Sequence, residues 1–281
     1  MPGINSVETR DGTQLFCKSL GEGRPVVLIH GWPLSADSWD PQMIALAEAG
    51  YRAIAYDRRG FGRSDQPPSG YDYDTFADDL ADVMAATGAT ENVALVGFSM
   101  GGGEIARYMS RHGGKGVSQA VLVSSVVPYM LQTHDNPDGV PQSTFDEMSA
   151  GMRKDFRHFF KSFFKSFYGV GYVTQPVSDE QLEWAWMISQ MAGQYATLQA
   201  AKAFASTDFR PDLASLTVPT LVIHGTADKT VPIDATGRAV AKTVPSASII
   251  EYDGVPHGVF ATDQDRLTQD LLTFLDSGTR A

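Results

Sequence analysis

The chain has 281 residues, of which 43% are hydrophobic and 20% charged, a composition typical of globular proteins. Its net charge of −11 disfavours nucleic acid and anionic membrane surfaces as partners. No apolar run approaches the length of a transmembrane helix, and the N-terminus lacks a basic, apolar leader. Because Cys17 is the only cysteine, no intrachain disulfide can form, and we expect a cytoplasmic protein.

The first half of the chain alternates between predicted strands and helices. Alternating apolar and polar residues after the Asp11-Gly12 turn predict an antiparallel hairpin at residues 14–18. Continuous apolar runs, typical of strands buried on both faces of a parallel sheet, come next. In chain order we expect strands at 25–31, 51–56, 93–98 and 119–124, and helices at 39–49 (capped by Ser38), 73–87 and 104–112.

The segment 127–209 breaks this rhythm, because it contains no predicted strand. Its aromatic residues recur at helical spacing, which predicts amphipathic helices with a wide apolar face. We interpret the segment as a helical cap inserted into a core formed by residues 1–126 and 210–281. Most of its aromatic side chains are expected to be buried, and a few to line a substrate pocket. The aromatic residues are Phe156, Phe159, Phe160, Phe163, Phe164, Phe167, Trp184 and Trp186, and Met187 and Met191 belong to the same apolar faces.

The alternation resumes after the cap. Strands are predicted at 219–225 and 248–252, and helices at 233–242 and 263–275. Alternating strands and helices predict an α/β fold, a mostly parallel sheet of eight strands with helices on both faces. In such sheets, sites lie at the carboxyl ends of strands.

A Gly-x-Ser-x-Gly sequence at 97–101 follows one of these strands and precedes a helix. Strand, sharp turn and helix is the context of a nucleophile elbow, which exposes its serine, here Ser99. Gly97 and Gly101 lack Cβ atoms, so the strand and helix can approach closely around it. The alternative is a glycine-rich turn with an idle serine.

A serine needs a base, and six histidines are candidates. His257 follows the last strand in a short loop that can reach across the sheet to Ser99. Asp228, after the strand that contains His224, is the best third member, with Asp253 as an alternative better suited to an Asx turn. The order Ser, Asp, His is that of the α/β-hydrolase fold.

An oxyanion formed on acylation needs backbone donors. One should be the amide of Met100, and the other should come from the loop after the strand at 25–31. Trp32 is the best donor there, since Pro33 has no N–H. No histidine pair has metal-ligand spacing, so we expect no metal.

Five stretches of the sequence carry a family resemblance. The matching stretches are 30–39, 56–64, 97–104, 207–212 and 256–258. Through them the chain resembles the α/β-hydrolases known as cofactor-free haloperoxidases, bacterial aryl esterases and perhydrolases. The resemblance implies a triad of Ser99, Asp228 and His257, with no metal, no haem and no other cofactor. It implies hydrolysis of small carboxylic esters, and perhydrolysis, in which hydrogen peroxide replaces water and yields a peracid that oxidises halide.

A proline after Trp32, here Pro33, is a feature in which the chain resembles the haloperoxidase-like members of this family. Because proline restricts the residue before it, we expect it to aim the Trp32 carbonyl at peroxide. Tentative pocket residues are Trp32, Pro33, Phe98, Phe164, Phe167 and Val231. A lactamase, amidase or lactonase on the same triad, or a non-catalytic binding protein of this fold, stays open as an alternative. A homo-oligomer is compatible with the resemblance.

Overall fold

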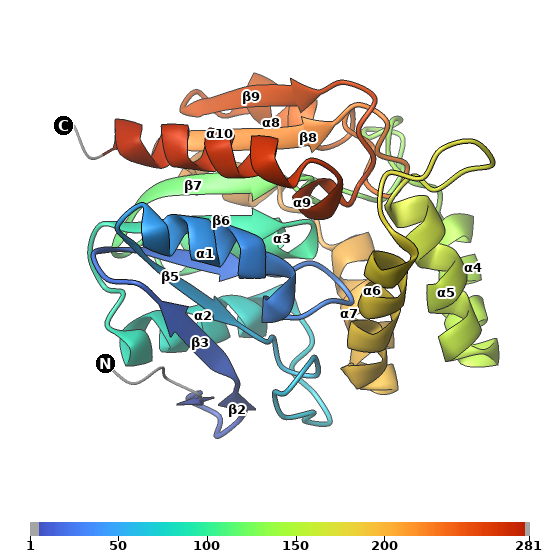
Figure 1. The fold of residues 1–281 in the computed structure, drawn as a ribbon, viewed down its shortest axis with the longest axis horizontal. Coiled ribbons are helices and arrows are strands. Elements are labelled where there is room, and N and C mark those ends of the chain that lie inside the picture. Colours follow the sequence, from blue (N-terminus) through green and yellow to red (C-terminus); the bar gives the residue numbers. More distant parts are fainter. Residues whose placement is uncertain (1–5, 279–281) are drawn as a thin grey trace.

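A twisted, mostly parallel sheet of seven strands forms the centre of the computed structural model, which describes residues 6–278 (Figure 1). Its spatial order is β3-β5-β4-β6-β7-β8-β9, and only β3 runs antiparallel to its neighbour. The strands are β3 (Cys17–Leu20), β4 (Arg24–Ile29), β5 (Tyr51–Tyr56), β6 (Val93–Phe98), β7 (Val117–Val123), β8 (Thr220–Gly225) and β9 (Ala247–Tyr252). All six residues of β6 and of β8 are buried, as expected for central strands covered on both faces.

The prediction of eight strands is wrong for the part of the chain that the structure describes. The predicted strand at 14–18 divides at Phe16 into two strands of two different sheets. β1 (Val7–Glu8) and β2 (Gln14–Leu15) form a separate antiparallel pair, and β3 joins the main sheet. The break has a physical cause: the Phe16 N–H donates to Ser64 Oγ and its carbonyl accepts from Asp57 N–H, so its backbone bonds to a loop.

Helices cover both faces of the sheet. α1 (Asp40–Glu48), α9 (Val259–Thr262) and α10 (Gln264–Ser277) lie in front of the sheet in Figure 1. Behind it lie α2 (Tyr73–Thr87), α3 (Met100–Arg111) and α8 (Gly237–Thr243). Ser38 does not cap α1, because a 3₁₀ helix (Ala36–Trp39) precedes it and the Ser38 hydroxyl donates to the Ser35 carbonyl.

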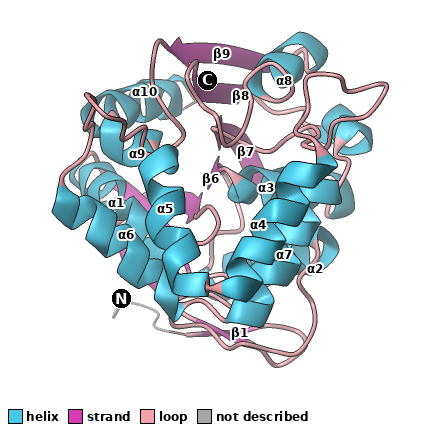
Figure 2. Ribbon diagram, turned by 90° about the vertical axis from the view of Figure 1, so that its right-hand side faces the viewer, coloured by secondary structure: helices cyan, strands magenta, loops and turns pink. Residues whose placement is uncertain are grey.

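Four further helices separate β7 from β8 and lie beyond the carboxyl ends of the parallel strands (Figure 1). They are α4 (Gln142–Lys154), α5 (Phe156–Phe167), α6 (Asp179–Met191) and α7 (Gln194–Ser206). Figure 2 faces this side of the molecule, with α5 and α6 on one side and α4 and α7 on the other. Phe156, Phe160, Phe164 and Phe167 of α5 are buried, whereas Met187 and Met191 of α6 are exposed.

The sheet has a topological switch between β4 and β6. The chain leaves β4 for β5 on one side and returns to place β6 on the other. Connections therefore diverge at the carboxyl ends of β4 and β6, which opens a crevice where sites of α/β sheets lie. The loop with Trp32 follows β4 and Ser99 follows β6, so both predicted site segments meet at this crevice.

Candidate active site

Ser99 occupies a sharp turn between β6 and α3. Its φ of 53° and ψ of −116° lie in a region that non-glycine residues rarely adopt. The turn is tight because its glycines lack side chains. A Cβ on Gly97 would lie 2.6 Å from the Gly101 carbonyl, and one on Gly101 would lie 2.6 Å from the Ile29 carbonyl oxygen. The hydroxyl thus stands at the start of α3, beside the loop after β4.

The structure brings Ser99, His257 and Asp228 together in one hydrogen-bonded row. His257 Nε2 lies 3.0 Å from Ser99 Oγ, and His257 Nδ1 lies 2.6 Å from Asp228 Oδ2. All three residues are buried. Asp228 follows β8, and His257 lies in the loop after β9. Because the carboxylate is an acceptor, Nδ1 carries the proton and Nε2 is free to accept one from the serine.

The Asp228 carboxylate has donors on both oxygens. Oδ1 accepts from the backbone N–H groups of Thr230 at 2.9 Å and Val231 at 2.8 Å. Burial raises the pKa of the carboxyl, but the neighbouring His257 and His224 lower it by more, so its pKa falls well below its ordinary value. Asp228 is therefore an anion at neutral pH and can stabilise a cationic His257.

The competing side chains have other partners. Asp253 is exposed and accepts from Thr226 Oγ1 at 3.2 Å, which links the loops after β9 and β8, and within residues 6–278 it forms no hydrogen bond with His257. His112 lies 2.8 Å from Asp78 at the far end of α3. His30 bonds to the Gly31 carbonyl through Nδ1 and accepts the Arg58 N–H at Nε2, so it shapes the loop after β4.

Two backbone N–H groups flank the serine. Gly31 allows the loop after β4 to approach, since a Cβ there would lie 3.0 Å from the Ser99 Cβ. Within residues 6–278, neither the Trp32 N–H nor the Met100 N–H donates a hydrogen bond to a protein acceptor. Backbone N–H groups without a protein acceptor are free to bond a ligand, and donors of this kind form the oxyanion holes of enzymes that stabilise a developing negative charge. The Trp32–Pro33 peptide bond is cis.

A cavity of about 160 Å³ opens at Ser99 and His257. Its walls are mainly apolar and come from the sheet loops and from α4, α5 and α7. Its lining comprises Trp32, Ser99, Val126, Met130, Val140, Thr144, Phe145, Met148, Phe163, Ser166, Phe204, Lys229, Thr230, Val231 and His257. Of the six predicted pocket residues, Trp32 and Val231 line this cavity.

The other four predicted pocket residues lie outside the lining, which corrects the prediction. Phe98 and Phe167 instead pack on the His257 ring, with ring centroids 5.0 and 4.8 Å away. The Phe164 ring stacks on that of Tyr168, with ring centroids 6.2 Å apart. Pro33 is buried in its loop, next to Trp32.

Sequence reasoning missed Phe163, which lines the cavity and contacts the Trp32 ring at 5.4 Å. It is one residue, or about 100°, around the helix from Phe164. The phenylalanine-rich pattern marks the apolar face of α5 but does not tell which part of it faces the crevice. Phe145, Phe204 and the methionines of the lining carried no local signal of their own.

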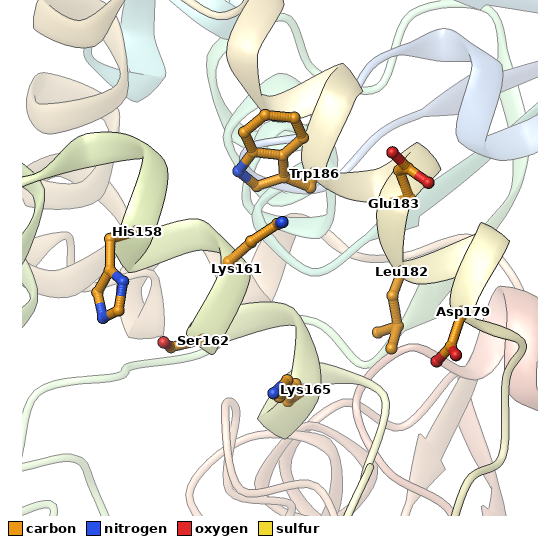
Figure 3. A pocket seen from close by; sticks show the side chains of 8 residues that line it. All are labelled: His158, Lys161, Ser162, Lys165, Asp179, Leu182, Glu183 and Trp186. Carbon is orange, nitrogen blue, oxygen red and sulfur yellow. The ribbon is translucent and has the colours of Figure 1, made fainter.

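A larger hollow of about 450 Å³ lies between α5 and α6 (Figure 3). It is lined by charged side chains and Trp186, and it shares no residue with the cavity at Ser99. Lys161 lies 5.3 Å from the Trp186 ring. Ser99 and His257 line the smaller cavity and not this hollow, so the smaller cavity is the candidate active site.

Residues 6–278 contain no cluster of three or more histidine, cysteine, aspartate or glutamate side chains arranged to hold a metal ion. No helix in that part of the chain is long and apolar enough to cross a membrane.

Residues 24–264 match the family model of the alpha/beta hydrolase fold, and the chain belongs to that family. Within it, the chain is 43% identical over 270 residues to a non-heme chloroperoxidase of Kitasatospora aureofaciens, covering 95% of this chain and 98% of that one. It is 39% identical to a bifunctional esterase/perhydrolase of Acinetobacter calcoaceticus, covering 96% and 99%. Among solved structures, a bromoperoxidase from Bacillus anthracis superposes with a TM-score of 0.93 at 41% identity, covering 98% and 99%.

Proposed function

We propose that this protein is a serine hydrolase that cleaves small carboxylic esters through an acyl-enzyme and also catalyses perhydrolysis with hydrogen peroxide. One observation carries the proposal: the row Ser99, His257 and Asp228 opens onto an apolar cavity beside two unbonded backbone N–H groups. The similarity to an esterase/perhydrolase and to a non-heme chloroperoxidase supports the same reading.

In the first half-reaction, Ser99 Oγ attacks the ester carbonyl carbon while His257 Nε2 takes the hydroxyl proton. The new C–O bond converts the carbonyl to an oxyanion, which accepts hydrogen bonds from the N–H groups of Trp32 and Met100. Asp228 stabilises the imidazolium and keeps Nδ1 protonated. Collapse breaks the bond to the alkoxide, which leaves as alcohol with the proton from His257.

In the second half-reaction, His257 removes a proton from water or hydrogen peroxide, whose oxygen attacks the acyl carbon. Collapse returns the proton to Ser99 and releases a carboxylic acid or a peracid. Acylation by a free carboxylic acid releases water, which gives a route from acid and peroxide to peracid. The released peracid then oxidises halide in solution, which accounts for a haloperoxidase activity.

Pro33 is proposed to favour peroxide over water. The carbonyl of Trp32, fixed by the following proline, would accept a hydrogen bond from the bound peroxide. Pro33→Leu should therefore lower the ratio of perhydrolysis to hydrolysis. An unchanged ratio would contradict this role.

The surroundings of the site complete the proposal. Residues 127–209, which contribute α4, α5 and α7 to the cavity wall, are proposed to act as a cap that selects the acyl group. The proposed location is the cytoplasm, which suits a chain with one buried cysteine. We also propose that the chain associates into a homo-oligomer, which size measurements in solution would test.

A paired assay tests the function. Hydrolysis of p-nitrophenyl acetate and formation of peracetic acid from acetate and hydrogen peroxide are followed with chelator present, for the wild type and Ser99→Ala. Both activities should appear in the wild type and vanish in the variant. Hydrolysis without perhydrolysis would restrict the protein to an esterase. If neither appears, the same pair of proteins would be tested on lactams, lactones and amides, and inactivity there would favour a binding protein.

A further inference from the structure

His224, in β8, is a fully buried histidine that the reaction above does not use. Its Nε2 lies 2.9 Å from the Val231 carbonyl oxygen and 3.3 Å from Asp228 Oδ2. Both oxygens are acceptors only, since Asp228 is ionised. Nε2 must therefore carry the ring proton, with its shorter bond to Val231.

The surroundings of the other ring nitrogen, Nδ1, determine whether the His224 imidazole is neutral or charged. Within residues 6–278, His224 Nδ1 has no hydrogen-bond partner and is buried. A proton there would be a buried donor without an acceptor, which costs more than a bare acceptor nitrogen. The start of α8 leaves little room at this edge, since a Cβ on Gly237 would lie 2.9 Å from His224 Nδ1. The ring is thus neutral and protonated on Nε2.

These contacts link His224, Val231 and Asp228 in a closed network around the catalytic carboxylate. The Val231 N–H donates to Asp228 Oδ1 at 2.8 Å, and the Val231 carbonyl accepts from His224 at 2.9 Å. The turn 228–231 is thereby tied back to a central strand. Asp228 Oδ2 accepts a hydrogen bond from the His257 Nδ1–H at 2.6 Å, and it also faces the partial positive charge of the His224 N–H.

We propose that His224 is a positioning residue for the catalytic carboxylate, which it holds through Val231 and whose negative charge it shares with His257. The inference rests on the proposed function, in which Asp228 orients His257. Losing the His224 N–H leaves the Val231 carbonyl unbonded and frees the turn. It also concentrates charge toward His257, which should make that imidazole more basic.

Few charged groups lie near this network of His224, Val231 and Asp228. Glu251 of β9 lies opposite His224 in the sheet but is exposed and pairs with Arg238 of α8 at 2.6 Å. Lys229 and Asp253 are exposed in the loops after β8 and β9. From α5 the uncharged ring of Phe167 packs on His257. A change in the pH profile on altering His224 would therefore be transmitted through Asp228.

Two amide substitutions separate positioning from packing. In His224→Gln the side-chain NH₂ can replace the Nε2–H, whereas in His224→Asn the shorter amide reaches only the Nδ1 position. His112→Asn, at the far end of α3, is the matched control. The measurement is the pH dependence of kcat and KM for p-nitrophenyl acetate, with thermal unfolding of each variant.

His224→Asn is expected to lower kcat about tenfold with little change in KM, because the Val231 carbonyl loses its donor and the ionised Asp228 carboxylate loses the nearby N–H. The acid limb of its kcat/KM profile should move up by about half a pH unit. His224→Gln should restore both, and His112→Asn should change neither. Equal profiles for the Gln and Asn variants would overturn the proposal.

A measurement on the unmodified protein covers the case in which the Asn variant does not fold. The ¹⁵N NMR spectrum of the imidazoles should show His224 as neutral and protonated on Nε2 across the active pH range. A proton on Nδ1 instead would overturn the proposal. A wild type that turns over no ester would contradict the proposed function, whereas this tautomer would still report on the His224 contacts.

Discussion

At the residue scale, the proposed activity depends on how the side chains of Ser99, His257 and Asp228 share two protons. The pKa of Asp228 lies below its ordinary value, because the nearby imidazoles outweigh the cost of burial. Asp228 therefore stays ionised well below neutral pH. The pH profile of the activity should show no step from the Asp228 carboxylate near neutral pH.

Asp228→Asn tests the carboxylate. An amide cannot stabilise the imidazolium and favours the wrong tautomer of His257, so kcat should fall by about 10³- to 10⁴-fold at neutral pH. The measurement is steady-state hydrolysis of p-nitrophenyl acetate, with Asp253→Asn as the control. If Asp253→Asn lost as much activity, the third member of the row would have been misassigned.

The same carboxyl links stability to pH. Because its pKa is depressed in the folded protein, its stabilising contribution is present above its unfolded value, about 4, and is lost as the pH falls below that. The free energy of unfolding, measured by urea titration, should fall less steeply from pH 5 to pH 3 in Asp228→Asn than in the wild type. Parallel curves for the two proteins would contradict the downward pKa shift assigned to Asp228 in the folded state.

At the element scale, the elbow and helix α5 were predictable to different degrees. The strand, serine turn and helix followed from local patterns, and helix α2 has the predicted bounds of 73–87. The division of the first predicted strand at Phe16 was not predictable, because it depends on bonds to a distant loop. The pocket lining was also out of reach, since helical spacing fixes the apolar face of α5 but not its neighbours.

Phe163 and Phe159 of α5 provide a matched pair for testing the proposed cap. Both are half-buried and their rings stack 5.9 Å apart, but only Phe163 lines the cavity. Phe163→Ala should enlarge the cavity and raise kcat/KM for longer acyl chains relative to acetyl esters, by about tenfold for each further methylene that the cavity can bury. Phe159→Ala should leave this ratio unchanged, and a chain-length series of p-nitrophenyl esters measures it. A shift of the same size in both variants would show that the cap acts through general loosening.

At the scale of the whole molecule, the net charge of −11 acts on every anionic substrate. Salt screens such repulsion over about 10 Å at 0.1 M. Raising the ionic strength should therefore increase kcat/KM for an ester with a free carboxylate, such as monomethyl glutarate, and not for neutral methyl pentanoate. A ratio that does not respond to salt would mean that local groups, such as Lys229 at the cavity, dominate the field there.

The arrangement of the whole chain was largely predictable because the three residues of the proposed triad each follow a strand of one sheet. Parallel strands place their carboxyl ends at one edge, so Ser99, Asp228 and His257 converge although they are far apart in sequence. The number of strands in the sheet was not predictable in the same way. It depends on the short N-terminal pairs, whose partners are set by tertiary contacts.

The central claim is that Ser99 carries the acyl group. The most direct measurement is peptide mass spectrometry of protein quenched in acid during turnover of p-nitrophenyl acetate, with the wild type and Ser99→Ala side by side. We predict an acetyl group on the peptide that contains Ser99, attached to its hydroxyl, and none in the variant. Sustained turnover with no acetyl group on Ser99, or with the label on another residue, would contradict the account.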